Sequence, residues 1–133
     1  MKRLLLMGAG HAHAQVLRDW AQRPQPGTEL VLVSPSALAP YSGMVPGWLA
    51  GHYAYEQICI DFAALAHAAR ARLVLDEMVG LDAAQRRVTL ASGAALDYDA
   101  LSLNIGSTLE PPPVQGVPLL ALRPLGCSLL KQR

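Results

Sequence analysis

The stretch Lys2-Arg3-Leu4-Leu5-Leu6-Met7-Gly8-Ala9-Gly10-His11-Ala12-His13-Ala14-Gln15-Val16-Leu17 decides the fold of this chain. The unbroken apolar run over residues 4–7 is typical of a central parallel strand that is covered on both faces. Gly8 lets the chain leave that strand sharply. A helix is predicted from His11 to about Gln22, because apolar side chains recur there at spacings of three and four residues. Strand, glycine turn and helix in this order are typical of the start of a dinucleotide-binding unit.

The glycine pattern of this turn is G-x-G-x-x-H, with His13 in place of the third glycine. Gly10 would let the backbone approach a pyrophosphate, because a side chain there would collide with it. The amides that open the helix would then face the phosphate charge, assisted by the helix dipole. The imidazoles of His11 and His13 could line such a pocket or simply pack. The pattern favours dinucleotide binding over a plain strand-to-helix turn.

A second buried strand is predicted over residues 29–33, and it completes a right-handed βαβ unit. Dinucleotide folds usually place an acidic residue at the end of this strand, where it holds the ribose hydroxyls. This chain has Ser34-Pro35-Ser36 there instead. A serine hydroxyl binds a ribose more weakly than a carboxylate and without charge. The substitution weighs against a nicotinamide cofactor in this unit.

The middle of the chain contains a loop rich in proline and glycine, followed by regular structure. The loop over residues 37–55 carries at most a short helix over residues 43–50, and its aromatic residues suit packing and ligand contact equally well. Residues 61–70 predict a helix with Asp61 as its N-cap. Residues 72–75 predict the third parallel strand.

The hydrophobic period then changes. Residues 77–81, 87–90 and 95–98 predict a small antiparallel meander on the edge of the sheet. Residues 99–107 predict a return to a buried strand, and residues 116–123 a further one. The fold class expected is α/β: a Rossmann-like parallel sheet of βαβ units with a small antiparallel meander inserted.

Composition narrows the class of protein further. The chain has 133 residues, the size of one ordinary domain, and a net charge of +1. No basic run exceeds Arg86-Arg87, so nucleic-acid binding lacks its electrostatic signature. The apolar content of 52% indicates a large core, or a surface that meets a partner or missing chain. The N-terminal apolar run is too short for a signal peptide or a membrane span.

Few side chains have the spacing that catalysis or metal binding requires. Cys59 and Cys127 lie far apart, which fits a reduced, cytoplasmic protein without a disulfide framework. His52 and His67 have no second ligand at metal-binding spacing, so no metal site is expected. No acidic pair is placed for general acid–base chemistry, and no catalytic residue is assigned.

Three motifs of the chain resemble FAD-dependent pyridine nucleotide-disulfide oxidoreductases. They are LLMGAGHAH at residues 5–13, PYSGMVPG at residues 40–47 and YDALSLNIGS at residues 98–107. The chain is most similar to the type II NADH dehydrogenase-like branch, some members of which are fused ahead of a selenide, water dikinase. Histidine at the third glycine position and Ser-Pro after the second strand are familiar variants in that branch. The redox cysteine pair of the wider family is absent near residues 41–46, so disulfide chemistry is not implied.

The resemblance covers roughly residues 2–123 and implies an FAD site. The glycine turn and the end of the second strand would surround the pyrophosphate and adenosine, and the loop at residues 41–46 would approach the flavin. Val79 would offer its backbone to the adenine, and residues 105–107 would close over the cofactor. The residues thus assigned to cofactor binding are Gly8, Gly10, His11, Ala12, His13, Ser34, Pro35, Tyr41, Ser42, Val79, Ile105, Gly106 and Ser107.

The length of the chain implies an incomplete enzyme. Two dinucleotide domains of on the order of 100–150 residues each are required to bring NAD(P)H to a flavin. Residues 1–133 would form the N-terminal part of an FAD/NAD(P)-binding domain, with an irregular or truncated tail over residues 124–133. The full-length parent would be an NAD(P)H-dependent flavin oxidoreductase that passes electrons to a quinone-like acceptor. It would be cytoplasmic or peripheral to a membrane, and this chain alone would be inactive.

Two other interpretations compete with the flavoprotein. The first is a non-catalytic Rossmann-like module that forms a homodimer, or binds a partner chain, through the apolar face left by the missing half. It predicts a stable dimer without a bound nucleotide. The second is a methyltransferase-like glycine turn. It is the weaker one, because those folds also carry an acidic residue after the second strand, and Ser34 is not acidic.

Overall fold

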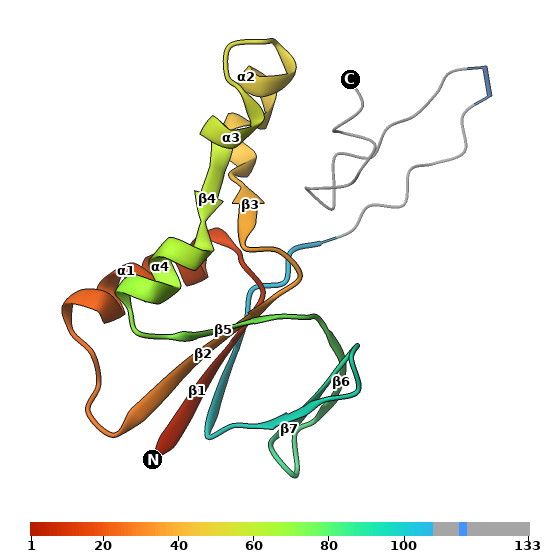
Figure 1. The fold of residues 1–133 in the computed structure, drawn as a ribbon. Coiled ribbons are helices and arrows are strands. Elements are labelled where there is room, and N and C mark those ends of the chain that lie inside the picture. The colour runs from red at the N-terminus through yellow and green to blue at the C-terminus, as the bar shows by residue number, and fades with distance from the viewer. Residues whose placement is uncertain (108–114, 117–133) are drawn as a thin grey trace.

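A computed structural model describes residues 1–107 and 115–116 of the chain. Its centre is a four-stranded sheet in the order β5-β2-β1-β9, in which every pair is parallel (Figure 1). The strands are β1 (Lys2–Met7), β2 (Thr28–Ser34), β5 (Arg72–Leu75) and β9 (Ala100–Leu103). The chain builds β1, β2 and β5 in one direction and then returns to the other side of β1 with β9. The order of strands therefore reverses beside β1.

Helices α1 (His11–Gln22) and α4 (Phe62–Ala68) cover one face of this sheet (Figure 1). Leu17 of α1 and Phe62 of α4 are fully buried against Leu6 and Leu32 of the central strands. Burying one such side chain stabilises the fold by about 1.5–3 kcal/mol. The bounds of α1 confirm the helix predicted from the sequence. Asp61 caps α4 as predicted, because its Oδ1 accepts the Ala64 amide at 3.0 Å.

A three-stranded antiparallel meander covers the opposite face of the sheet. Its strands are β6 (Met78–Asp82), β7 (Arg87–Leu90) and β8 (Ala95–Asp97). The buried residues Val88 and Leu90 alternate along β7 and pack against Leu5 and Met7 of β1. The sequence placed this meander on the edge of the sheet, and that placement was wrong. Strand β1 has apolar side chains on both faces of the sheet. The helices bury one set, and the meander buries the other.

The loop predicted after β2 forms an arm at the end of the sheet. Strands β3 (Leu38–Pro40) and β4 (Cys59–Asp61) pair antiparallel at its base. A short 3-10 turn (Ser42–Met44) and helices α2 (Val45–Leu49) and α3 (Tyr55–Ile58) complete it (Figure 1). The expected short helix is therefore present as α2. The three-residue strands were missed, because so short a segment carries no recognisable period.

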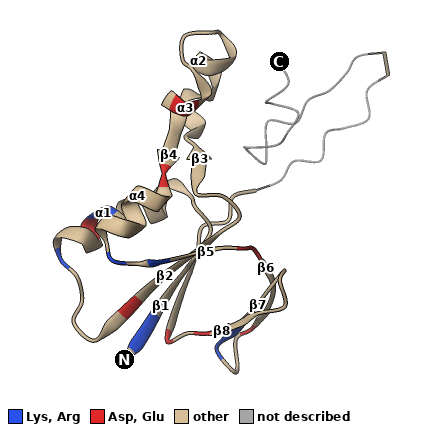
Figure 2. Ribbon diagram, in the orientation of Figure 1, with Lys and Arg blue, Asp and Glu red and all other residues tan. Residues whose placement is uncertain are grey.

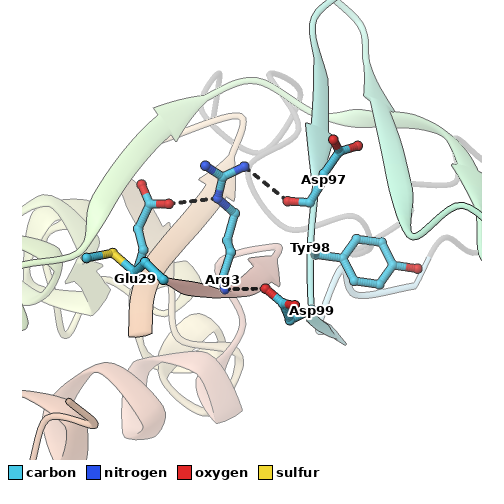
Figure 3. A pocket seen from close by; sticks show the side chains of 6 residues that line it. Arg3, Glu29, Asp97, Tyr98 and Asp99 are labelled. Carbon is cyan, nitrogen blue, oxygen red and sulfur yellow. Dashed lines mark hydrogen bonds and ion pairs between the residues drawn. The ribbon is translucent and has the colours of Figure 1, made fainter. Parts of the chain in front are cut away.

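Polar contacts join the amino ends of β1 and β2 to the link between β8 and β9. Arg3 Nε donates to Glu29 Oε2 at 2.7 Å, and Arg3 Nη1 donates to the Asp97 carbonyl at 3.1 Å (Figure 3). The Asp99 carboxylate accepts the Arg3 amide at 2.7 Å. Figure 2 shows both signs of charge at this end of the sheet. We assign a structural role to this cluster, because the charged groups of Arg3, Glu29, Asp97 and Asp99 all pair within the chain.

The predicted strand over residues 116–123 and the tail over residues 124–133 fall outside the described residues, apart from residue 116 itself. Among the residues that the structure describes, no helix is long and apolar enough to cross a membrane.

Candidate functional site

The glycine turn lies at the carboxyl end of the parallel sheet, where the strand order reverses. Gly8 follows β1, Asn104 follows β9, and Ser34 ends β2. In open α/β sheets, ligands bind outside the carboxyl ends of the strands at such a reversal. The topology therefore places the candidate site between the β1 turn and the end of β9.

Gly8 and Gly10 must both be glycine because Asn104 occupies the space that a side chain would need at either position. Gly8 has a φ of +97°, and a Cβ there would overlap the backbone carbonyl of Asn104. A Cβ on Gly10 would overlap the side-chain amide of the same asparagine. From the sequence, we explained Gly10 by the close approach of a pyrophosphate. The Asn104 side chain is a second reason for glycine at this position, and it holds without any ligand.

The N-terminus of α1 offers two unpaired amides. Its N-cap is Gly10, which has no side chain to satisfy the first turn. The His13 amide instead donates to Asn104 Oδ1 at 3.3 Å. The amides of His11 and Ala12 have no hydrogen-bond partner among the described residues. Such orphan donors at the positive end of a helix dipole form an anion-binding position.

His13 packs between the turn and β9. Its side chain is buried, with Nδ1 2.7 Å from the Gly8 carbonyl and Nε2 2.8 Å from Ser102 Oγ. Because a carbonyl can only accept, Nδ1 carries the proton, and Nε2 accepts from the Ser102 hydroxyl. Burial lowers the pKa of His13, although its hydrogen bond to Gly8 opposes that shift. Of the two roles open to this imidazole, the structure shows the packing one. A cofactor contact by His13 stays a prediction.

His11 and Tyr41 come together at the mouth of the site. Their rings stack with centroids 5.1 Å apart and planes inclined at 30°. The Tyr41 amide donates to the Ile58 carbonyl at 2.7 Å, which fixes the start of the arm. Ser42 follows in the 3-10 turn and is exposed. The structure thus joins two of the three sequence motifs that predicted the cofactor site.

The end of β2 carries no charged side chain, and its serine hydroxyl pairs with the backbone two residues further on. Ser34 is buried, and its hydroxyl donates to the Ser36 carbonyl at 2.7 Å. Pro35 between them is exposed. The hydroxyl that was expected to face a ribose therefore has an internal partner. The ribose contact of Ser34 remains a prediction.

The remaining predicted residues carry exposed groups. Val79 lies in β6 with 64% of its surface exposed, and Ile105, directly after Asn104, is 63% exposed. Gly106, with a φ of +76°, and Ser107 continue from Ile105 and are also exposed. Of these four residues, Ile105 lies beside the glycine turn, because its Cα is close to the Cβ position of Gly8. The structure records no contact between Val79 and that turn.

Asn104 and Ser102 are the site residues that the sequence prediction missed. Asn104 contacts both glycines and the helix start, and Ser102 holds His13. A signal was available, because Asn104 is the only asparagine in the chain and directly follows a buried strand. Polar side chains at that place in a parallel sheet belong to the ligand-binding edge.

No group of three or more His, Cys, Asp or Glu side chains among the described residues could hold a metal ion. Cys59 is partly buried on β4. Burial raises the pKa of the Tyr55 hydroxyl, and the neighbouring Cys59 raises it further.

Comparisons with known proteins identify the fold. No family model and no curated protein sequence matches the chain. Among solved structures, it resembles a ferredoxin reductase from Rhodopseudomonas palustris, with 27% identity and a TM-score of 0.69 over 83% of this chain. It also resembles the sulfide:quinone oxidoreductase of Aquifex aeolicus, with 20% identity and a TM-score of 0.67 over 80% of this chain. A third match is the water-forming NADH oxidase of Lactobacillus brevis, solved with NADH bound. It has 17% identity and a TM-score of 0.64 over 86% of this chain.

These matches cover only part of each neighbour. The chain spans 28% of the Rhodopseudomonas reductase, 24% of the Aquifex enzyme and 27% of the NADH oxidase. All three proteins are oxidoreductases by name. The α/β fold predicted from the sequence, a parallel sheet with a small antiparallel one, is therefore confirmed as a fold that such enzymes contain.

Proposed function

We propose that this chain is the FAD-binding portion of an NAD(P)H-dependent flavin oxidoreductase. One observation carries the proposal: a glycine turn and the unpaired amides of His11 and Ala12 lie at the reversal of strand order. A pyrophosphate carries negative charge and acceptor oxygens, and these amides are donors at a positive helix end.

The exposed residues around the turn suit the other parts of FAD. The stacked rings of His11 and Tyr41 border the phosphate position and would extend it toward the flavin. Val79 would meet the adenine, Ser34 and Pro35 the ribose, and residues 105–107 would close the other side. When bound, FAD would supply the capacity to accept a hydride and pass on electrons, and the chain would bind and orient it.

The electron donor and acceptor belong to a larger assembly than this chain. A nicotinamide donor is suggested by the sequence resemblance, and the matched oxidase was solved with NADH. The acceptor we propose is quinone-like, as the name of the Aquifex enzyme indicates for that protein. The chain spans about a quarter of these neighbours. We therefore propose that it does not catalyse electron transfer by itself.

Titration of the purified chain with FAD tests the binding half of the proposal. We expect flavin fluorescence to be quenched at micromolar protein, and ADP to compete, because the pyrophosphate position is shared. Gly8→Ala should abolish quenching, since its Cβ would overlap Asn104. Gly93→Ala is the matched control: Gly93 also has a positive φ, of +90°, but no atom lies within 4 Å of its Cβ position. Wild-type protein that quenches no flavin at high concentration would contradict FAD binding.

A self-associating module without a nucleotide is the alternative function. Strand β9 ends in Leu103, which is half exposed, and is followed by the exposed Ile105. Light scattering on the same sample separates the two functions. A stable dimer that binds no FAD supports the module, whereas a monomer that quenches flavin supports the cofactor-binding portion.

A further inference from the structure

We propose that Asn104 is a cofactor-binding residue with two roles: its Oδ1 holds the helix start, and its Nδ2 donates to a phosphate oxygen. This inference rests on the proposed dinucleotide function and assigns a side-chain donor to that site.

The backbone of Asn104 is fixed against the glycine turn. Its amide donates to the Met7 carbonyl at 2.8 Å, which continues the pairing of β9 with β1 by one residue. Its own carbonyl lies against Gly8, and its side chain lies over Gly10. The residue that directly follows β9 thus determines how closely the turn approaches that strand.

The orientation of the carboxamide follows from its partner. The group within 3.3 Å of the His13 amide must be an acceptor, because two N–H donors would face each other if the amide were reversed. Oδ1 therefore faces α1, and Nδ2 occupies the other side of the side chain. Oδ1 performs the capping that Gly10 lacks the side chain to provide.

The Nδ2 group is a free donor at the mouth of the site. It has no hydrogen-bond partner among the described residues. No buried side-chain nitrogen or oxygen in the described ranges lacks a partner, so Nδ2 is open to solvent. It lies beside Gly10, the residue directly before His11 and Ala12, whose amides are unpaired among the described residues. A phosphate at the helix N-terminus would therefore meet three N–H groups rather than two.

The isosteric substitution Asn104→Asp distinguishes phosphate binding by Nδ2 from a purely structural role of the side chain. Asn104→Asp keeps an acceptor for the His13 amide, and a carboxylate at a helix N-terminus is itself favourable, so the apo protein should melt at the same temperature or higher. The variant replaces the Nδ2 donor with negative charge. We therefore expect the Kd for FAD and for ADP to rise at least about tenfold, because hydrogen bonds to charged groups have that strength. Gln85→Glu adds the same charge in an exposed hairpin turn and should alter neither quantity.

The pH and salt dependence of the variant provides a second readout. The weakening should shrink as pH falls toward the ordinary carboxyl pKa of about 4, and as salt screens the repulsion. An Asp variant that melts as expected and binds FAD as tightly as the wild type would overturn the role of Nδ2.

A measurement on the unmodified chain completes the test. Because Asn104 is the only asparagine, selective ¹⁵N-asparagine labelling gives one side-chain NH2 pair in the NMR spectrum. Addition of ADP should shift that pair, and an unmoved pair in ADP-saturated protein would overturn the proposal. If the wild type binds neither FAD nor ADP, the proposed function itself fails, which is a different outcome.

Discussion

At the residue scale, two polar side chains shape the candidate site from opposite sides. Asn104 fills the space above Gly8 and Gly10, and His13 bridges the turn to Ser102 on β9. His13 occupies the position where a third glycine would allow close packing of helix and strand. A buried imidazole that pairs with a carbonyl and a hydroxyl replaces the missing glycine with specific hydrogen bonds.

The buried state of His13 predicts how stability depends on pH. Its pKa lies below the ordinary value of 6.5, so below that pH the unfolded chain binds a proton more readily than the folded one. The free energy of unfolding should therefore fall as pH drops from 6.5 toward the lowered pKa of the folded state, and be constant for this group above 6.5. Urea unfolding at several pH values measures this slope.

His13→Gln is the informative variant for that prediction, because a glutamine amide can still donate to one neighbour and accept from the other. It should flatten the slope below pH 6.5. His67→Gln is the control, because His67 is exposed on α4. An unchanged slope in His13→Gln would show that another group governs the pH dependence.

At the scale of elements, α1 and α4 begin in different ways. Asp61 caps α4 from the adjacent residue, and α1 is capped by Asn104, which is 91 residues from His13 in sequence. A local cap can be predicted from the sequence, whereas a cap that comes from another strand cannot. The helix without a local cap is the one whose N-terminus faces the candidate site.

Removal of the Asp61 cap should weaken the fold by a predictable amount. Asp61→Ala leaves the Ala64 amide without its acceptor, which costs about 1 kcal/mol of unfolding free energy. Chemical denaturation monitored by circular dichroism measures the loss. Asp61→Asn keeps an acceptor oxygen and should recover most of the stability. Equal losses in both variants would contradict the capping role.

At the scale of the whole molecule, the parallel sheet is packed on both faces, and the candidate site lies at its carboxyl end. The helices bury one face and the meander buries the other (Figure 1). The amino end is joined by charged contacts, and the carboxyl end carries the glycine turn and exposed apolar side chains. This division separates the groups that hold the fold together from those that are free to bind a ligand.

The meander should unfold together with the sheet. Leu90 is fully buried between them, so Leu90→Ala should lower the unfolding free energy by about 2–5 kcal/mol. Leu81→Ala, at a half-exposed position of β6, should change it by about 0.5 kcal/mol or less. Tryptophan fluorescence and circular dichroism should report one coincident transition. A small loss in Leu90→Ala, or two separate transitions, would contradict the packing of the meander on the sheet.

The sequence by itself determined the elements whose signals are local. The apolar run of β1, the three- and four-residue period of α1, and the Asp61 cap are properties of neighbouring residues, and each was confirmed. The tertiary structure alone decided which face the meander covers and which residue closes the glycine turn. Those outcomes depend on residues far apart in the chain: Asn104 lies against Gly8, and Val88 belongs to the same core cluster as Leu5. A period or a motif specifies which face of an element is apolar, but not the partner against which that face is buried.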